Sequence, residues 1–205
     1  MLNSTGFDLW ADGYDKSVGL SDESDRYPFA GYRAMMNALY QRVLRQSGRD
    51  VLDVGFGTGV LTSQLYAQGC RIYGQDFSAR MISLAQEKMP EARLCQGDFS
   101  KGLAPELCAQ RYDAIVATYS LHHLSDAQKI DFIRTLLPLL QPDGCLFIGD
   151  VAFRTRKELE ACRKAAGNAW DADEIYFVYD ELRPHFPALT FESFSHCTAL
   201  LTLRR

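Results

Sequence analysis

Apolar residues follow two patterns along this chain. Short runs rich in β-branched and aromatic residues, typical of buried strands, lie at residues 51–54, 71–76, 93–98, 112–119 and 145–150. Between them, apolar residues recur every three or four positions, as Val60, Leu61 and Leu65 do, which predicts helices. Strands that alternate with helices form a parallel sheet with helices packed on it, so the pattern predicts an α/β fold.

Local signals place the ends of several helices. Ser78 precedes one helical stretch, and capping-box patterns open two more, at Ser125-x-x-Gln128 and Thr155-x-x-Glu158. An earlier stripe with 3-4-3-4 spacing, from Phe29 to Val43, predicts an amphipathic helix packed on the sheet. Two strand-like runs at residues 190–195 and 198–203 predict a terminal antiparallel pair.

Polar residues end the five predicted parallel strands. These residues are Asp53, Asp76, Asp98, Tyr119 and Asp150. The carboxyl ends of parallel strands share one edge of a sheet, and ligands of open α/β sheets bind at that edge. The sequence therefore predicts a ligand site lined by four carboxylates and a tyrosine.

Three alternating glycines follow the first strand, in Asp53-Val54-Gly55-Phe56-Gly57-Thr58-Gly59. At a strand-to-helix turn, glycines remove side chains that would block a ligand, and the first N–H groups of the helix face it. The dinucleotide fingerprint GxGxxG would require glycine at position 60, where the chain has Val60. The pattern is DxGxGxG instead.

This loop resembles the cofactor-binding motif of class I S-adenosylmethionine (SAM) methyltransferases. Together with the N-terminal FDLWADGYD, it most resembles uncharacterised bacterial small-molecule methyltransferases. The resemblance implies a Rossmann-like fold, with a mostly parallel seven-stranded sheet, helices on both faces and an antiparallel C-terminal strand. It also implies a single methyltransferase domain over residues 1–205, with a helical cap (1–47), a SAM-binding core (48–152), a helical lid (153–188) and a strand pair (189–205).

The resemblance implies S-adenosyl-L-methionine as cofactor and assigns residues to its parts. Asp76 matches the acid that accepts hydrogen bonds from the ribose hydroxyls, and Asp98 matches the acid that meets the adenine amino group. The full implied cofactor-binding set is Asp53, Gly55, Phe56, Gly57, Thr58, Gly59, Asp76, Phe77, Met81, Asp98, Phe99 and Tyr119.

Methyl transfer by in-line displacement needs alignment above all, and it needs a base only when the acceptor arrives protonated. The candidate catalytic residues are His122, His123 and Tyr14, with neutral imidazole the better base near pH 7. We expect at least one of the two histidines to be structural. Asp150 is an alternative group for orienting an acceptor.

Composition narrows the acceptor and the environment. A net charge of −4 argues against a nucleic-acid partner. In methyltransferases an Asn/Asp-Pro-Pro-Tyr motif at the fourth strand end marks amino-group methylation of adenine or glutamine, and this chain lacks it. We therefore expect a small-molecule acceptor. Six cysteines without CxxC spacing and four histidines without three-ligand spacing predict no metal site. The sequence has neither an apolar membrane span nor an N-terminal signal pattern, so we expect a cytoplasmic protein without a membrane partner.

Two other functions compete with an active methyltransferase. A non-catalytic SAM-binding sensor or interaction module would explain the lack of an unambiguous base. An NAD(P)-linked oxidoreductase would share the strand-loop-helix and Asp76, but Val60, Asp98 and the terminal strand pair argue against it.

Overall fold

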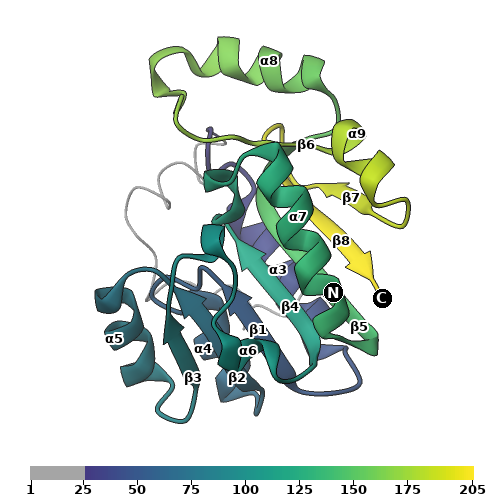
Figure 1. The fold of residues 1–205 in the computed structure, drawn as a ribbon. Helices are drawn as coiled ribbons and strands as arrows, with labels where there is room; N and C mark the ends of the chain where they lie inside the picture. Colours follow the sequence, from purple (N-terminus) through teal and green to yellow (C-terminus); the bar gives the residue numbers. More distant parts are fainter. Residues whose placement is uncertain (1–25) are drawn as a thin grey trace, which may run out of the picture.

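The computed structural model describes residues 26–205 and is built around one twisted sheet (Figure 1). Its main path has the order β3-β2-β1-β4-β5-β8-β7. The strands on this path are β1 (Asp50–Val54), β2 (Arg71–Asp76), β3 (Arg93–Gln96), β4 (Tyr112–Thr118), β5 (Leu140–Phe153), β7 (Thr190–Ser193) and β8 (Thr198–Arg204).

Strand pairing matches the predicted Rossmann-like fold. β3, β2, β1, β4 and β5 pair in parallel, whereas β8 is antiparallel to both β5 and β7. The strand order reverses between β1 and β4, so the loops after these two strands lie side by side at the carboxyl edge. An eighth strand of two residues, β6 (Phe177–Val178), pairs with the end of β5 and was not predicted.

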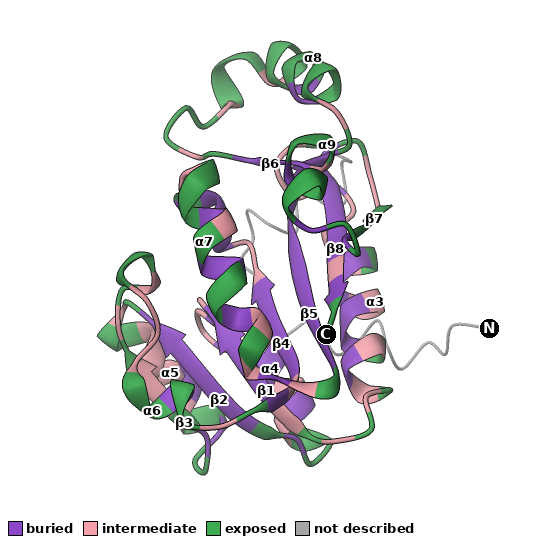
Figure 2. Ribbon diagram, turned by 45° about the vertical axis from the view of Figure 1, so that its right-hand side comes forward, coloured by how far each residue is buried: buried purple, intermediate pink, exposed green. Residues whose placement is uncertain are grey.

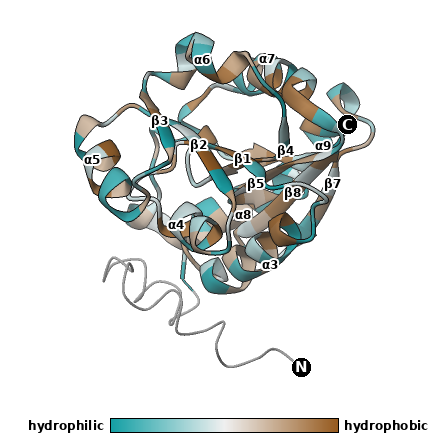
Figure 3. Cartoon of the chain, turned by 90° about the horizontal axis from the view of Figure 1, so that it is seen from below, coloured by the Kyte–Doolittle hydropathy of each residue, from teal (hydrophilic) through white to brown (hydrophobic). Residues whose placement is uncertain are grey.

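Helices cover both faces of the sheet, as Figure 3 shows in a view from below. One buried cluster joins the strands to α3 (Tyr32–Leu44), α4 (Val60–Ala67) and α5 (Ala79–Lys88). The other joins them to α6 (Pro105–Cys108), α7 (Asp126–Leu136) and α9 (Tyr179–Leu182). Neighbouring strand residues serve opposite faces, as Val51 and Leu52 do, because successive side chains of a strand alternate.

The predicted helix starts are confirmed. Ser78 accepts a hydrogen bond from the Met81 N–H, and complete capping boxes open α7 at Ser125 and α8 (Arg156–Ala166) at Thr155. The predicted stripe forms α3, which packs on the sheet. A Cβ on Gly149 of β5 would lie 2.4 Å from the Met35 sulfur, so a larger residue there would force the Met35 side chain of α3 to move.

Residues 153–188 contain more than helices. α8 is largely exposed and stands at one end of the molecule (Figures 1 and 2). Residues 174–178, here called the strap, return to the core: the Ile175 N–H donates to the His122 carbonyl at 2.8 Å, and the Lys129 ammonium donates to the Ile175 carbonyl. β6 then extends the contact with β5. A lid function for residues 153–188, like the division of the chain into cap, core, lid and strand pair, stays a prediction.

No helix among residues 26–205 is both long and apolar enough to cross a membrane.

Candidate functional site

The glycine loop joins β1 to α4 at the carboxyl edge. Gly55, Gly57 and Gly59 have φ angles of 74°, 55° and 72°, a left-handed conformation that favours glycine. A Cβ on Gly55 would lie 2.5 Å from the Ser120 Cβ, and one on Gly59 would lie 3.0 Å from the Met89 terminal methyl. A Cβ on Gly57 would meet no described atom within 4 Å. Two glycines therefore serve packing, and Gly57 leaves an open surface.

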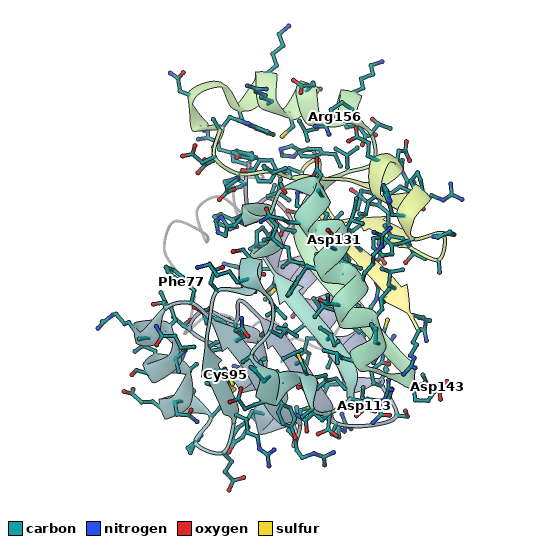
Figure 4. The ribbon with its side chains drawn as sticks, viewed as in Figure 1. Phe77, Cys95, Asp113, Asp131, Asp143 and Arg156 are labelled. Carbon is teal, nitrogen blue, oxygen red and sulfur yellow. The ribbon has the colours of Figure 1, made fainter. Side chains whose placement is uncertain are left out.

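Asp76 ties this loop to the next one. Its Oδ2 accepts from the Gly57 N–H at 2.8 Å and its Oδ1 from the Ser78 N–H at 2.9 Å, although the residue is only 8% exposed. Each carboxylate oxygen has further acceptor capacity, so Asp76 can still accept from a ligand hydroxyl. Phe77 follows it and is 73% exposed, and Figure 4 shows its ring at the outer edge of the ribbon.

Asp53 lies under the loop on β1 and is 1% exposed. Its Oδ1 finds no hydrogen-bond partner within residues 26–205. Burial, reinforced by the nearby Asp76 charge, raises the pKa of Asp53 to about 8. Buried polar atoms normally have a partner, so this oxygen marks a place where a bound donor would be favourable.

The third strand end contributes an acid and a ring. Asp98 is exposed, accepts from the Ser100 N–H and hydroxyl at 3.0 and 2.6 Å, and pairs with Lys101, so it caps a short 3-10 helix, η1 (Phe99–Lys101). These hydrogen bonds lower the pKa of Asp98. Phe99 packs on Phe132 with ring centroids 5.9 Å apart. Asp98 thus has a structural role that remains compatible with a ligand contact.

Three other predicted cofactor residues differ in how they face the site. The Phe56 side chain is buried in the cluster that joins the sheet to α3, α4 and α5, so Phe56 contributes only its backbone to the surface of the loop. The Thr58 carbonyl accepts from the Lys88 ammonium at 2.9 Å, which braces the loop. Met81 lies half-buried in the first turn of α5, four residues after Phe77.

Tyr119 turns the chain at the end of β4 with φ 47°, an unusual value for a bulky residue. Such a conformation costs about 1–3 kcal/mol and is concentrated at functional sites. Its ring packs against Phe29 and Tyr32, at centroid distances of 5.2 and 5.3 Å, and its hydroxyl lies 3.0 Å from the Thr198 hydroxyl. The ring is therefore committed to packing, and Tyr119 contributes mainly through the turn that it makes.

The two histidines follow this turn in η2 (Leu121–His123) and have different surroundings. His122 is buried, with Nδ1 2.7 Å from Asp150 Oδ1 and Nε2 3.3 Å from Glu174 Oε1. Burial alone would lower its pKa, but the two carboxylates outweigh that effect and raise the pKa of His122 to about 10. Both ring nitrogens of His122 therefore face a carboxylate, and the assignment of His122 as a catalytic base stays a prediction, like those of His123 and Tyr14. His123 is exposed, and Tyr14 lies outside the described residues.

Sequence reasoning missed the contribution of the strap. No sequence motif marks Glu174, yet its side chain reaches His122 and also accepts from the Tyr176 hydroxyl at 2.6 Å. Ser120 was missed too; its hydroxyl donates to the Val54 carbonyl at 2.9 Å and so joins the ends of β1 and β4.

A cavity of about 490 Å³ lies elsewhere, between α8 and the β7–β8 hairpin. Its lining includes Phe153, Cys162, Phe191 and His196 but no residue of the glycine loop and neither η2 histidine. It is therefore separate from the site at the carboxyl edge.

Comparisons with known proteins agree with this geometry. Residues 51–144 match a methyltransferase domain family. An uncharacterized methyltransferase from Anoxybacillus flavithermus is 38% identical over 183 residues, which cover 89% of this chain and 83% of that protein.

Two solved structures share the fold. Magnesium protoporphyrin IX methyltransferase from Synechocystis PCC 6803, with bound SAH, has a TM-score of 0.69 at 20% identity and covers 99% of this chain and 95% of its own. A S-adenosylmethionine-dependent methyltransferase from Clostridium acetobutylicum has a TM-score of 0.68 at 14% identity and covers 94% of this chain and 99% of its own. By its sequence relatives and in line with the resemblance of its glycine loop, the chain belongs to the methyltransferase family.

Proposed function

We propose that this protein transfers the methyl group of S-adenosyl-L-methionine to a small-molecule acceptor by in-line displacement. The observation that carries the proposal is the open left-handed Gly57 beside Asp76. A Cβ there would occupy space that no described atom fills, and its N–H is held by the acid at the end of β2. The named relatives and the bound SAM or SAH of the structural neighbours support the choice of cofactor.

The residues at the carboxyl edge suit the parts of this cofactor. Asp76 has spare acceptor capacity for the ribose hydroxyls, and the exposed Phe77 offers a ring face for adenine. The unpartnered Asp53 oxygen suits the ammonium end of the methionine moiety, which would supply the missing donor and a compensating charge. Gly55 and Gly59 set the loop's shape, and the Phe99 ring lies next to Gly55.

Methyl transfer requires the protein mainly to position the methyl donor and the acceptor. The acceptor's nucleophilic atom attacks the sulfonium methyl, the new bond to carbon forms as the carbon–sulfur bond breaks, and the sulfur keeps the electron pair. Holding both reactants in line can contribute about 7–11 kcal/mol. The chain's role is to fix the methyl donor against the turn at Tyr119 and to present the acceptor from the η2 side.

We assign the two histidines different roles. His122 is a positioning residue, because Asp150 and Glu174 hold both of its ring nitrogens. His123 is exposed on the same turn and is the group that would meet the acceptor. Asp150 acts through His122 rather than on an acceptor, since its Oδ1 already accepts from His122 and from the Val151 N–H.

A small acceptor fits the features of the edge. The strap is tied to the core through Ile175, which hydrogen-bonds to the η2 turn, so a folded segment borders the acceptor side of the edge. The net charge of −4 further disfavours a nucleic-acid acceptor.

The first test is calorimetric titration with S-adenosylhomocysteine, using NAD and NADP as controls. We expect micromolar or tighter binding of S-adenosylhomocysteine alone, followed by methyl transfer from labelled SAM to a metabolite panel. Saturable NAD binding without S-adenosylhomocysteine binding would refute the cofactor assignment. Tight cofactor binding without transfer to any class of small acceptor would favour the sensor function.

A further inference from the structure

Three side chains that could coordinate a metal ion meet beside the η2 turn. His122, His123 and Glu174 each offer one ligand atom, and these atoms all lie within 4.8 Å of one another. The histidines follow β4, whereas Glu174 arrives from the strap. We propose that His122, His123 and Glu174 form a binding site for a divalent transition-metal ion at the acceptor side of the carboxyl edge.

The spacing between His122 and Glu174 suits a zinc-like ion. His122 Nε2 lies 3.3 Å from Glu174 Oε1. Two ligand atoms that each lie 2.0–2.1 Å from a tetrahedral zinc ion are about 3.3–3.4 Å apart. A charge-assisted hydrogen bond between nitrogen and a carboxylate is usually shorter, at about 2.7–2.9 Å. The observed distance also matches two ligands of one ion, and such an ion would take the place of the proton between His122 and Glu174.

Outer partners hold both ligands in orientation. Asp150 Oδ1 lies 2.7 Å from His122 Nδ1, so it fixes the ring with Nε2 directed at Glu174. The Tyr176 hydroxyl donates to Glu174 Oε2 at 2.6 Å and leaves Oε1 to face the histidine. Carboxylates that accept from the second nitrogen of a histidine are a regular feature of metal sites, where they fix the tautomer and raise ligand basicity.

The backbone holds the strap in place for this role. The Ile175 N–H donates to the His122 carbonyl at 2.8 Å, so the residue after Glu174 is bonded to the residue that bears the facing imidazole. The Lys129 ammonium donates a hydrogen bond to the carbonyl of the same residue, Ile175. Glu174 is thus delivered to His122 by fixed backbone contacts.

The donor set indicates the class of ion and its use. Two imidazoles and one carboxylate suit Zn²⁺, Co²⁺ or Ni²⁺ better than Mg²⁺ or Ca²⁺, which prefer oxygen ligands. Three protein ligands leave at least one coordination position open. If the proposed function holds, this position lies on the acceptor side, where the ion would polarise an acceptor hydroxyl or thiol and ease its deprotonation.

The test is metal titration of untagged, chelator-stripped protein. We expect one Co²⁺ per chain with the visible absorption of a four- or five-coordinate site, and displacement by Zn²⁺. Glu174→Gln and His123→Asn should each weaken binding at least tenfold. The matched control is His185→Asn, an exposed histidine in η5 (Arg183–His185), which should bind Co²⁺ as the wild type does.

S-adenosylhomocysteine titration of the same variants separates the two proposals. His123 is exposed and Glu174 lies on the strap, so both variants should fold and keep their S-adenosylhomocysteine affinity. Cofactor binding without stoichiometric Co²⁺ or Zn²⁺ binding would overturn the metal site and leave the methyltransferase proposal standing. Metal binding that survives both substitutions would also overturn it. Metal binding without cofactor binding would refute the methyltransferase proposal alone.

Discussion

Replacing Gly57 by alanine is the most direct test of the glycine loop. At φ 55° the substitution places a non-glycine residue in the left-handed region, which costs about 1–2 kcal/mol. The new methyl meets no described atom within 4 Å, so no steric cost is added. Part of the strain is offset by about 0.4–1 kcal/mol, because alanine restricts the unfolded chain. We expect Gly57→Ala to lower the free energy of unfolding by about 1 kcal/mol and to leave the fold intact.

Gly57→Ala should also weaken cofactor binding several-fold or more. If the open space at Gly57 receives the cofactor, an extra methyl there overpacks the contact at a cost of about 1–3 kcal/mol, or roughly 5- to 150-fold in Kd. Urea unfolding gives the stability change, and calorimetry with S-adenosylhomocysteine gives the affinity.

Two other glycines serve as matched variants. Gly69→Ala has the same left-handed strain, at φ 81°, and the same open surroundings, but it lies in the turn after α4, away from the carboxyl edge. It should match Gly57→Ala in stability and wild type in affinity. Gly55→Ala adds a clash with Ser120 at 2.5 Å and should cost about 2–5 kcal/mol of stability. Equal S-adenosylhomocysteine affinities for Gly57→Ala and Gly69→Ala would refute the placement of the cofactor at the loop.

Other substitutions test the acids and the strap. Asp76→Ala should weaken S-adenosylhomocysteine binding by about 1–3 kcal/mol by calorimetry, because the ribose hydroxyls lose a charged acceptor; unchanged affinity in a folded variant would remove Asp76 from the site. Asp53 has a folded pKa of about 8 against an ordinary 3.8, so the folded chain holds an extra proton between these values. The protein's free energy of unfolding should therefore fall as pH rises from about 4 to 8. Urea titrations of Asp53→Asn should show a flatter pH dependence. An unchanged slope would mean that another group causes it. Lys129→Met leaves the Ile175 carbonyl without its ammonium partner, so amide exchange in residues 174–178 should accelerate relative to β4; equal protection in both proteins would contradict the anchoring role.

Much of the framework is written in local sequence. The five parallel strands, the capped starts of α5, α7 and α8, and the terminal antiparallel pair were all predictable from short windows. Hydrophobic period and cap chemistry act between residues a few positions apart, so a linear pattern records them. The convergence of Asp53 and Asp76 also followed, because parallel strands place their carboxyl ends together.

The contacts that surround His122 could not be derived in this way. His122 depends on Asp150 from β5 and on Glu174 from the strap, and it was the strap's contacts through Ile175 and Lys129 that brought Glu174 to it. The two-residue β6 likewise exists only because β5 continues to Phe153. The sequence determined the α/β fold, the glycine loop and the acids at its edge, because these depend on near neighbours. Which histidine faces two carboxylates was decided by tertiary structure, because these contacts depend on groups that are close in space but distant along the chain.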